Sequence, residues 1–391
     1  MVRRPPAGFT LVELLVAMAL TGVALGLAVL LLRPASEAFR AMPEAVDAQQ
    51  RLRVAVRSLV EGIGLAGAGP SQGWGARAQP TWPPVLPCRF KGSPPGMLAG
   101  GCARDDAITI LGVDLAAPQA ILAEDLASAN APMRLAPLSA CALSRAECRM
   151  HEGSRALVAD GTGAWDIVSV TAVSEDGTIV DHAGMPLSRT YTAGAIVSEA
   201  GSAAFSIQND SASGAPQLRR AFDGAADMPV VDHVTAMRFE YFGEPLAPQV
   251  LDDADIERRR TSYGPLPPPA GADNSLDTWM PGENCLFSRE AGQPVARLAA
   301  RPVDESGLAR LPMAALADGP WCPDSASPNR FDGDLLRVRL VRLTLRVQAA
   351  SVSARGADPQ LFSRPGTARD AGRLVPDLEV RVDVALRNTP R

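Results

Sequence analysis

The sequence predicts an α+β protein in which a long N-terminal helix, with a transmembrane half and an amphipathic half, precedes a β-rich, mostly antiparallel globular domain. Three patterns predict this: an apolar run over 9–32, helical periodicity up to residue 68, and short alternating segments beyond it. The chain has 391 residues, 47% of them hydrophobic and 21% charged, as in folded proteins. Its net charge of -5 argues against a protein that binds nucleic acid through bulk electrostatics. Nucleic acid is therefore not an expected partner.

The first element is the apolar run 9–32, whose only charged residue is Glu13. At ~1.5 Å per residue this helix is about 36 Å long, enough to cross a hydrocarbon core of ~30 Å. Arg3 and Arg4 precede it, which favours a cytoplasmic N-terminus. The run is longer than the ~7–15 apolar residues of a secretory signal peptide. A plain signal anchor fits the length but leaves Glu13 unexplained, because a carboxylate in a bilayer costs roughly 2.5–3.5 kcal/mol.

The stretch "RRPPAGFTLVE" (residues 3–13) resembles the class III leader of type IV prepilins and type II secretion pseudopilins. The resemblance implies a leader peptide over 1–8, cut after Gly8 by a prepilin peptidase, and N-methylation of the new terminal residue, Phe9. It also implies that Glu13 is an assembly residue, which meets the Phe9 amine of a neighbouring subunit. Two buried charges neutralise each other only when they are paired, so Glu13 would fix the axial register.

The second element is an amphipathic stem helix over 33–68. Pro34 and Pro43 can kink it, because proline lacks a backbone donor. Glycines at 62, 64 and 67 are expected to end it. Apolar residues recur on one side of this helix at Val46, Leu52, Val56, Leu59 and Ile63.

The extracytoplasmic domain, 69–391, is expected to consist mostly of strands bounded by turn residues. In the clearest strand, 378–388, apolar and charged residues alternate, which predicts an antiparallel sheet with one buried face. A Pro/Gly-rich insertion is expected near 244–330. The other expected strands are 105–113, 155–160, 165–173, 177–182, 194–200, 203–208, 216–222, 233–243 and 335–348.

Six cysteines in loop-like surroundings indicate disulfides and an oxidising compartment. We expect the local pairs, although six cysteines allow about 15 pairings. These pairs are Cys88–Cys102, Cys141–Cys148 and Cys285–Cys322.

Two other kinds of site find less support in the sequence than an assembly site. A catalytic site is not expected, because the three histidines His151, His182 and His233 match no hydrolase or metalloprotease motif, and no cofactor motif follows a strand. Clustered carboxylates make calcium a weak candidate, since hard cations take several oxygen ligands. The candidate calcium ligands are Asp252, Asp253, Asp255, Asp332 and Asp334.

The order of features resembles PilW-type minor pilins and, more loosely, GspJ-type minor pseudopilins. This implies a non-catalytic subunit that primes or caps a type IV pilus or a type II secretion pseudopilus. Its partners would be prepilin peptidase, other pilins or pseudopilins, the inner-membrane assembly platform and membrane lipid. It would cross the inner membrane once, with a periplasmic or extracellular domain, and then lie at the filament tip. A tip adhesin or DNA-uptake subunit and a signal-anchored periplasmic enzyme are the alternatives.

Overall fold

An N-terminal helix followed by antiparallel sheets confirms the expected fold class. The contacts of the chain define two units: residues 1–52 with 347–378, and residues 53–346 with 379–391. The computed structural model describes residues 10–68, 82–89, 103–113, 117–138, 141–183, 187–222, 226–252, 254, 262–272, 278–305, 307–327, 330–369 and 374–388, with only the backbone for 32–40 and 183.

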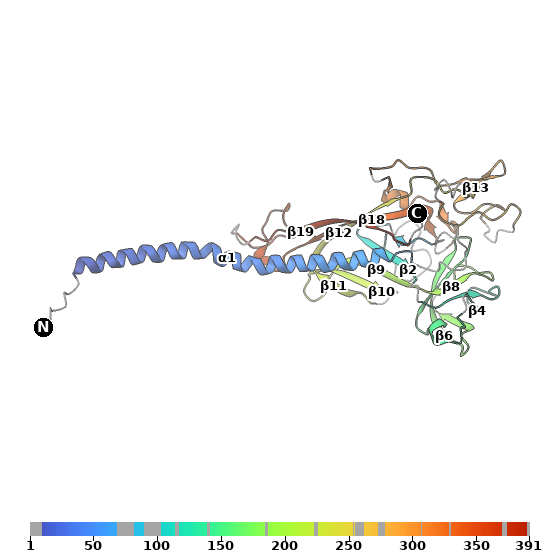
Figure 1. Cartoon of the computed structure of the whole chain (residues 1–391), viewed down its shortest axis with the longest axis horizontal. Helices are drawn as coiled ribbons and strands as arrows, with labels where there is room; N and C mark the ends of the chain where they lie inside the picture. The colour runs from blue at the N-terminus through green and yellow to red at the C-terminus, as the bar shows by residue number, and fades with distance from the viewer. Residues whose placement is uncertain are drawn as a thin grey trace. The chain divides into compact units, whose positions relative to one another are not determined.

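The helix α1 runs from Leu11 to Gly64 without a break (blue in Figure 1). It passes through Pro34 and Pro43, so neither proline ends it, although each lacks the N–H that would bond the preceding turn. Gly67 has φ 72°, a left-handed conformation that suits the chain reversal after the helix.

In the first unit, residues 347–378 pack on the middle of α1. Ala41 and Ala45 contact a small buried cluster of Ala349, Ala354 and Val375. The Glu44 carboxylate accepts hydrogen bonds from the backbone N–H groups of Ala350 (3.1 Å) and Ser351 (3.3 Å). A 3-10 turn, η4 (Val352–Ala354), follows at once. Small side chains and one carboxylate therefore attach this loop to the helix.

In the second unit, the last turns of α1 pack on a five-stranded sheet (Figure 1). Leu59 and Ile63 are fully buried there. A side chain on Gly62 would meet Ile110 at 3.0 Å and Phe205 at 3.2 Å, so glycine permits the close approach. The strand order is β1 (Val85–Leu86), β2 (Ala107–Gly112), β9 (Gly201–Asn209), β10 (Pro216–Phe222) and β11 (Met228–Asp232).

A second sheet has the order β15 (Ala309–Leu311), β12 (Val234–Gly243), β18 (Val338–Val347) and β19 (Leu378–Ala385). His233, with φ 61°, makes the turn between β11 of the first sheet and β12 of the second. Strand β19 alternates between half-buried apolar and exposed residues, as the sequence predicts. On its outer face, Arg342 and Asp383 form an ion pair at 2.6 Å.

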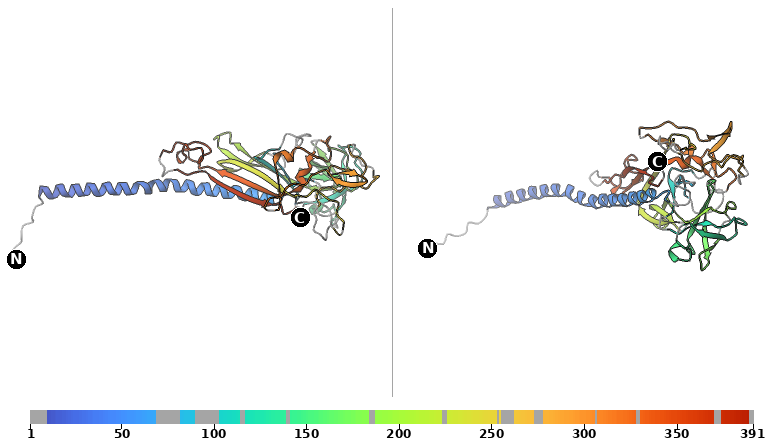
Figure 2. Two further views of the ribbon diagram at one scale, coloured as in Figure 1. Left: turned by 90° about the horizontal axis from the view of Figure 1, so that it is seen from above. Right: turned by 45° about the vertical axis from the view of Figure 1, so that its right-hand side comes forward.

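A closed barrel is inserted between β2 and β9, which are neighbours in the first sheet. The first and last residues of the inserted segment lie side by side, because the Glu199 N–H donates to the Pro118 carbonyl at 2.9 Å. Its strands are turquoise to green in Figure 2. Their order is β3 (Gln119–Leu122), β4 (Met133–Pro137), β7 (Ile179–Ala183), β6 (Trp165–Val173), β5 (Arg155–Ala159) and β8 (Ile196–Glu199).

The segment between β12 and β18 contains short elements arranged around a buried arginine, Arg337, which has no exposed surface. Its guanidinium donates to Asp334 (2.8 Å), to the Tyr263 hydroxyl (3.1 Å) and to the Leu246 carbonyl (3.0 Å). A buried charge is tolerated when it is paired and hydrogen-bonded, as here. Besides β15, the elements are β13 (Phe287–Glu290), β14 (Gln293–Ala296), η2 (Met313–Leu316), β16 (Trp321–Cys322), β17 (Phe331–Asp332) and η3 (Gly333–Arg337).

Two disulfides join Cys141 to Cys148 and Cys285 to Cys322, the pairs expected from the sequence. The first encloses the 3-10 turn η1 (Ala146–Cys148), and the second links the region before β13 to β16. Cys88 is also disulfide-bonded, and its expected partner Cys102 lies outside the described residues.

The packing of α1 on the first sheet leads to a stability prediction. Phe205 has no exposed surface, so Phe205→Ala should lower the free energy of unfolding by ~3–5 kcal/mol, the usual cost of a large cavity. Phe222, on neighbouring β10, is 41% exposed, and Phe222→Ala should cost about 1 kcal/mol or less. Denaturant unfolding followed by tryptophan fluorescence would measure both, and equal losses would contradict this packing.

Candidate functional site

The N-terminus of α1 is closed by a hydrogen-bonded pair, Thr10 and Glu13. The Glu13 Oε2 atom accepts from the Thr10 backbone N–H (2.9 Å) and the Thr10 hydroxyl (3.0 Å). The Glu13 N–H donates to Thr10 Oγ1 at 3.3 Å. This reciprocal arrangement is a capping box, which satisfies backbone donors at the start of a helix. The spacing T-x-x-E before an apolar run is the known sequence signal of a capping box, and this feature was not among those expected above.

The helix beyond this cap is long and apolar enough to cross a membrane over Leu11–Leu31, with mean hydropathy 2.6. None of this segment is buried within the chain, and Leu11 and Leu31 are 76% and 75% exposed. The Thr21 hydroxyl in this segment donates to the Ala17 carbonyl of the same helix at 2.7 Å. The segment therefore offers an apolar surface that needs lipid or other helices to cover it.

Two glycines leave one part of this helix surface without side chains. Gly22 and Gly26 are four residues apart and so lie on the same face of the helix. A side chain placed on either would meet nothing within 4 Å. This spacing lets a second helix approach closely in a membrane.

The two processing residues, Gly8 and Phe9, lie outside the described residues. The site that the structure places is therefore the beginning of α1, with Thr10 as cap and Glu13 as the third helical residue. Glu13 is exposed on the apolar helix.

The comparisons with known proteins bear on this same segment. The family model for the prokaryotic N-terminal methylation motif matches residues 3–29. The match covers Gly8, Phe9 and Glu13 and agrees with the class III leader expected from the sequence. No curated protein and no solved structure matches the chain.

The structure describes three of the five candidate calcium ligands. Asp253 and Asp255 lie outside the described residues, and Asp252 is exposed. Asp332 and Asp334 are buried, and their carboxylate oxygens lie within 4.8 Å of each other and of Asp318.

Asp334 already has two cationic partners in this cluster, Arg337 and Arg301, each at 2.8 Å. Asp332 accepts from two backbone N–H groups, those of Asp334 (2.8 Å) and Gly319 (2.6 Å). A calcium ion would have to compete with both arginines, so the geometry fits a structural role better than a cation site.

Two histidines have partners in the structure, but neither has a nucleophile. His151 Nδ1 lies 2.8 Å from Glu199 Oε1, and His182 Nε2 lies 3.1 Å from the Ala131 carbonyl oxygen. A triad histidine bonds a carboxylate through Nδ1, as His151 does, and also a serine or cysteine nucleophile through Nε2. Among the described residues, no serine or cysteine side chain hydrogen-bonds to either ring, so the arrangement lacks the nucleophile of a triad.

The buried Asp332 leads to a prediction about pH. Burial raises the pKa of its carboxyl to about 7, from an ordinary value of 3.8. The folded state then holds a proton that the unfolded state has lost, so the free energy of unfolding should fall as pH rises from about 4 to about 7, by up to about 4 kcal/mol. Denaturant unfolding at a series of pH values would measure this slope.

The control is a comparison of slopes rather than of absolute stabilities. Asp332→Asn should flatten the slope between pH 4 and 7. Asp318→Asn, at an exposed neighbour whose charge is the smallest contribution to the raised pKa of Asp332, should retain most of it. A wild-type protein whose stability rises over this range would contradict the raised pKa.

Proposed function

We propose that this chain is a minor pilin or pseudopilin, a non-catalytic subunit that primes or caps a type IV pilus or a type II secretion pseudopilus. The observation that supports this most is the methylation motif at residues 3–29, which overlies an exposed apolar helix with one carboxylate in its first turn. A prepilin peptidase would cut after Gly8, and Phe9 would carry the new, methylated amine. Arg3 and Arg4 favour a cytoplasmic site for this cut.

The capping box supports a role for Glu13 between subunits. The Thr10 contacts use only Oε2, and within the described residues no hydrogen bond reaches Oε1. That oxygen remains available for the Phe9 amine of a neighbouring subunit. Because an unpaired charge in the membrane is costly, subunits would be favoured in the axial position that brings the two groups together.

Two further observations support a subunit outside the cytoplasm and at the filament tip. Disulfides such as Cys285–Cys322 persist in oxidising compartments, which suits a periplasmic outer domain. That domain, 69–391, contains both an inserted barrel and a long insertion, and such bulk is difficult to repeat along a filament shaft. A low-copy position at the tip accommodates it.

The test compares two substitutions at Glu13 that separate charge from capping. Glu13→Gln keeps an oxygen that can accept from Thr10, and Glu13→Ala loses both functions. If the charge sets the register, both variants should insert and be cut but enter filaments poorly, because a broken buried pair costs about 3–5 kcal/mol, or more than 100-fold. The amount of cleaved subunit in a sheared filament fraction measures this.

Thr21→Ala serves as the control, since it removes a hydroxyl from the same membrane segment without touching Glu13. This variant should assemble normally. Normal assembly of Glu13→Gln would show that capping, rather than charge pairing, is the role of Glu13.

A further inference from the structure

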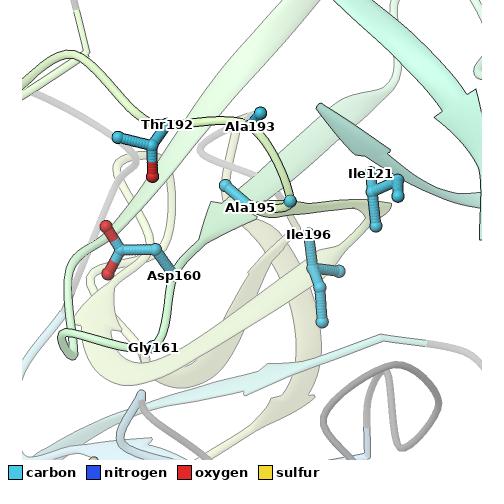
Figure 3. Close-up of a pocket in the computed structure, with 8 residues that line it drawn as sticks. Ile121, Asp160, Gly161, Thr192, Ala193, Ala195 and Ile196 are labelled. Atoms are coloured by element: carbon cyan, nitrogen blue, oxygen red, sulfur yellow. The ribbon is translucent and has the colours of Figure 1, made fainter. Parts of the chain in front are cut away.

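The inserted barrel has a pocket at one end that the proposed assembly role does not use. Its volume is about 280 Å³, near the lower limit of the ~300–1,000 Å³ typical of small-molecule sites. One wall is the turn after β5, at Asp160 and Gly161. The opposite wall is the loop 192–195 before β8, and Ile121 and Ile196 complete the lining (Figure 3).

Asp160 gives this pocket a carboxylate that is held in place but has a free oxygen. Its Oδ1 atom accepts from the Thr162 N–H (2.9 Å), the Thr162 hydroxyl (2.6 Å) and the Ala164 N–H (3.3 Å). Among the described residues, no hydrogen bond reaches Oδ2. Figure 3 shows the carboxylate of Asp160 and the hydroxyl of Thr192 pointing toward one another across the pocket. The Asp160 residue is only 8% exposed, so a ligand that reaches Oδ2 would find it largely shielded from water.

The opposite wall is preformed. The backbone N–H groups of Ala193, Gly194 and Ala195 donate to Asp125, Leu122 and Thr192 respectively, at 2.7, 2.9 and 3.2 Å. A loop held by three such backbone hydrogen bonds needs little reorganisation when a ligand binds, which favours affinity. The polar side chains among the lining residues are Asp160 and Thr192, which offer a ligand the Oδ2 atom and the hydroxyl.

Arg189 decides which class of ligand fits. Its guanidinium donates to the Thr162 hydroxyl at 3.4 Å and lies close enough to Asp160 to oppose the rise that burial causes in the pKa of that carboxyl. A cationic ligand would therefore meet a positive charge already beside the carboxylate. Neutral hydroxyl groups, which donate to Oδ2 and exchange hydrogen bonds with Thr192, avoid this repulsion, while Ile121 and Ile196 suit the C–H face of a sugar ring.

We propose that this pocket binds a single neutral sugar residue, such as a terminal hexose of a glycan, through hydroxyl donation to Asp160 Oδ2. The proposal concerns residues of the barrel and does not depend on filament assembly. A subunit that assembles normally but binds no sugar would leave the assembly role intact.

The test uses the full chain in a detergent without a sugar headgroup. Saturation-transfer NMR would be recorded with glucose, galactose, mannose and N-acetylglucosamine, and with methylammonium as a cationic probe. At least one sugar should bind saturably, with a Kd on the order of 1 mM. Asp160→Asn keeps an oxygen for the turn but replaces Oδ2 with an amide group, and should weaken binding at least tenfold.

Asp176→Asn is the matched control, because Asp176 is an exposed carboxylate in another turn of the same barrel, bonded to Ser174 and Thr178. It should bind as the wild type does. Thr192→Val, which removes a hydroxyl from the exposed wall, tests the pocket independently if Asp160→Asn fails to fold. Absence of binding by all four sugars, binding unchanged in both pocket variants, or binding of methylammonium alone would overturn the proposal.

Discussion

The single carboxylate of Glu13, on an otherwise apolar helix, is the main constraint on the N-terminal part of the molecule. It lies in the first turn of a helix whose next 18 or so residues expose only uncharged side chains, and no other charge lies between Leu11 and Leu31. Thr10 satisfies one oxygen and the adjacent backbone donors, which makes the helix end stable without removing the charge. An unpaired carboxylate on a membrane helix is costly in free energy. A cationic group on a partner subunit would lower that cost by neutralising the charge.

The outer part of the chain is built by insertion between neighbouring strands. The barrel lies between β2 and β9, which pair in one sheet, and the segment around Arg337 lies between β12 and β18, which are neighbours in the other. Each insertion has its own core or network: apolar side chains inside the barrel, and a fully bonded guanidinium at Arg337. The strands that pack against the last turns of α1 are thus separate from those that line the barrel pocket. Assembly and ligand binding can therefore reside on different elements of one chain.

The sequence predicted local features well and long-range pairing poorly. The membrane helix, its end near Gly64 and the alternation of β19 follow from periodicity and glycine placement, which act within a few residues. Glu13 stood out because one charge in an apolar run is conspicuous. The barrel was missed because β3 and β4 are short, and because closure depends on pairings such as Ile121 with Ile196, far apart in sequence. Asp160 resembles any turn aspartate in the sequence, and only the loop 192–195 opposite makes it part of a pocket.

We propose that α1 begins as a processed, methylated helix and that Glu13 pairs with the Phe9 amine of a neighbouring subunit. The most direct test is mass spectrometry of the N-terminus of the chain isolated from its native membrane. A chain that begins at N-methylated Phe9, with Glu13 as the fifth residue, is the result that this account predicts. An intact Met1 terminus would show a plain membrane anchor. A terminus beyond Leu31 would show a secreted protein without Glu13, and either result would contradict the claim.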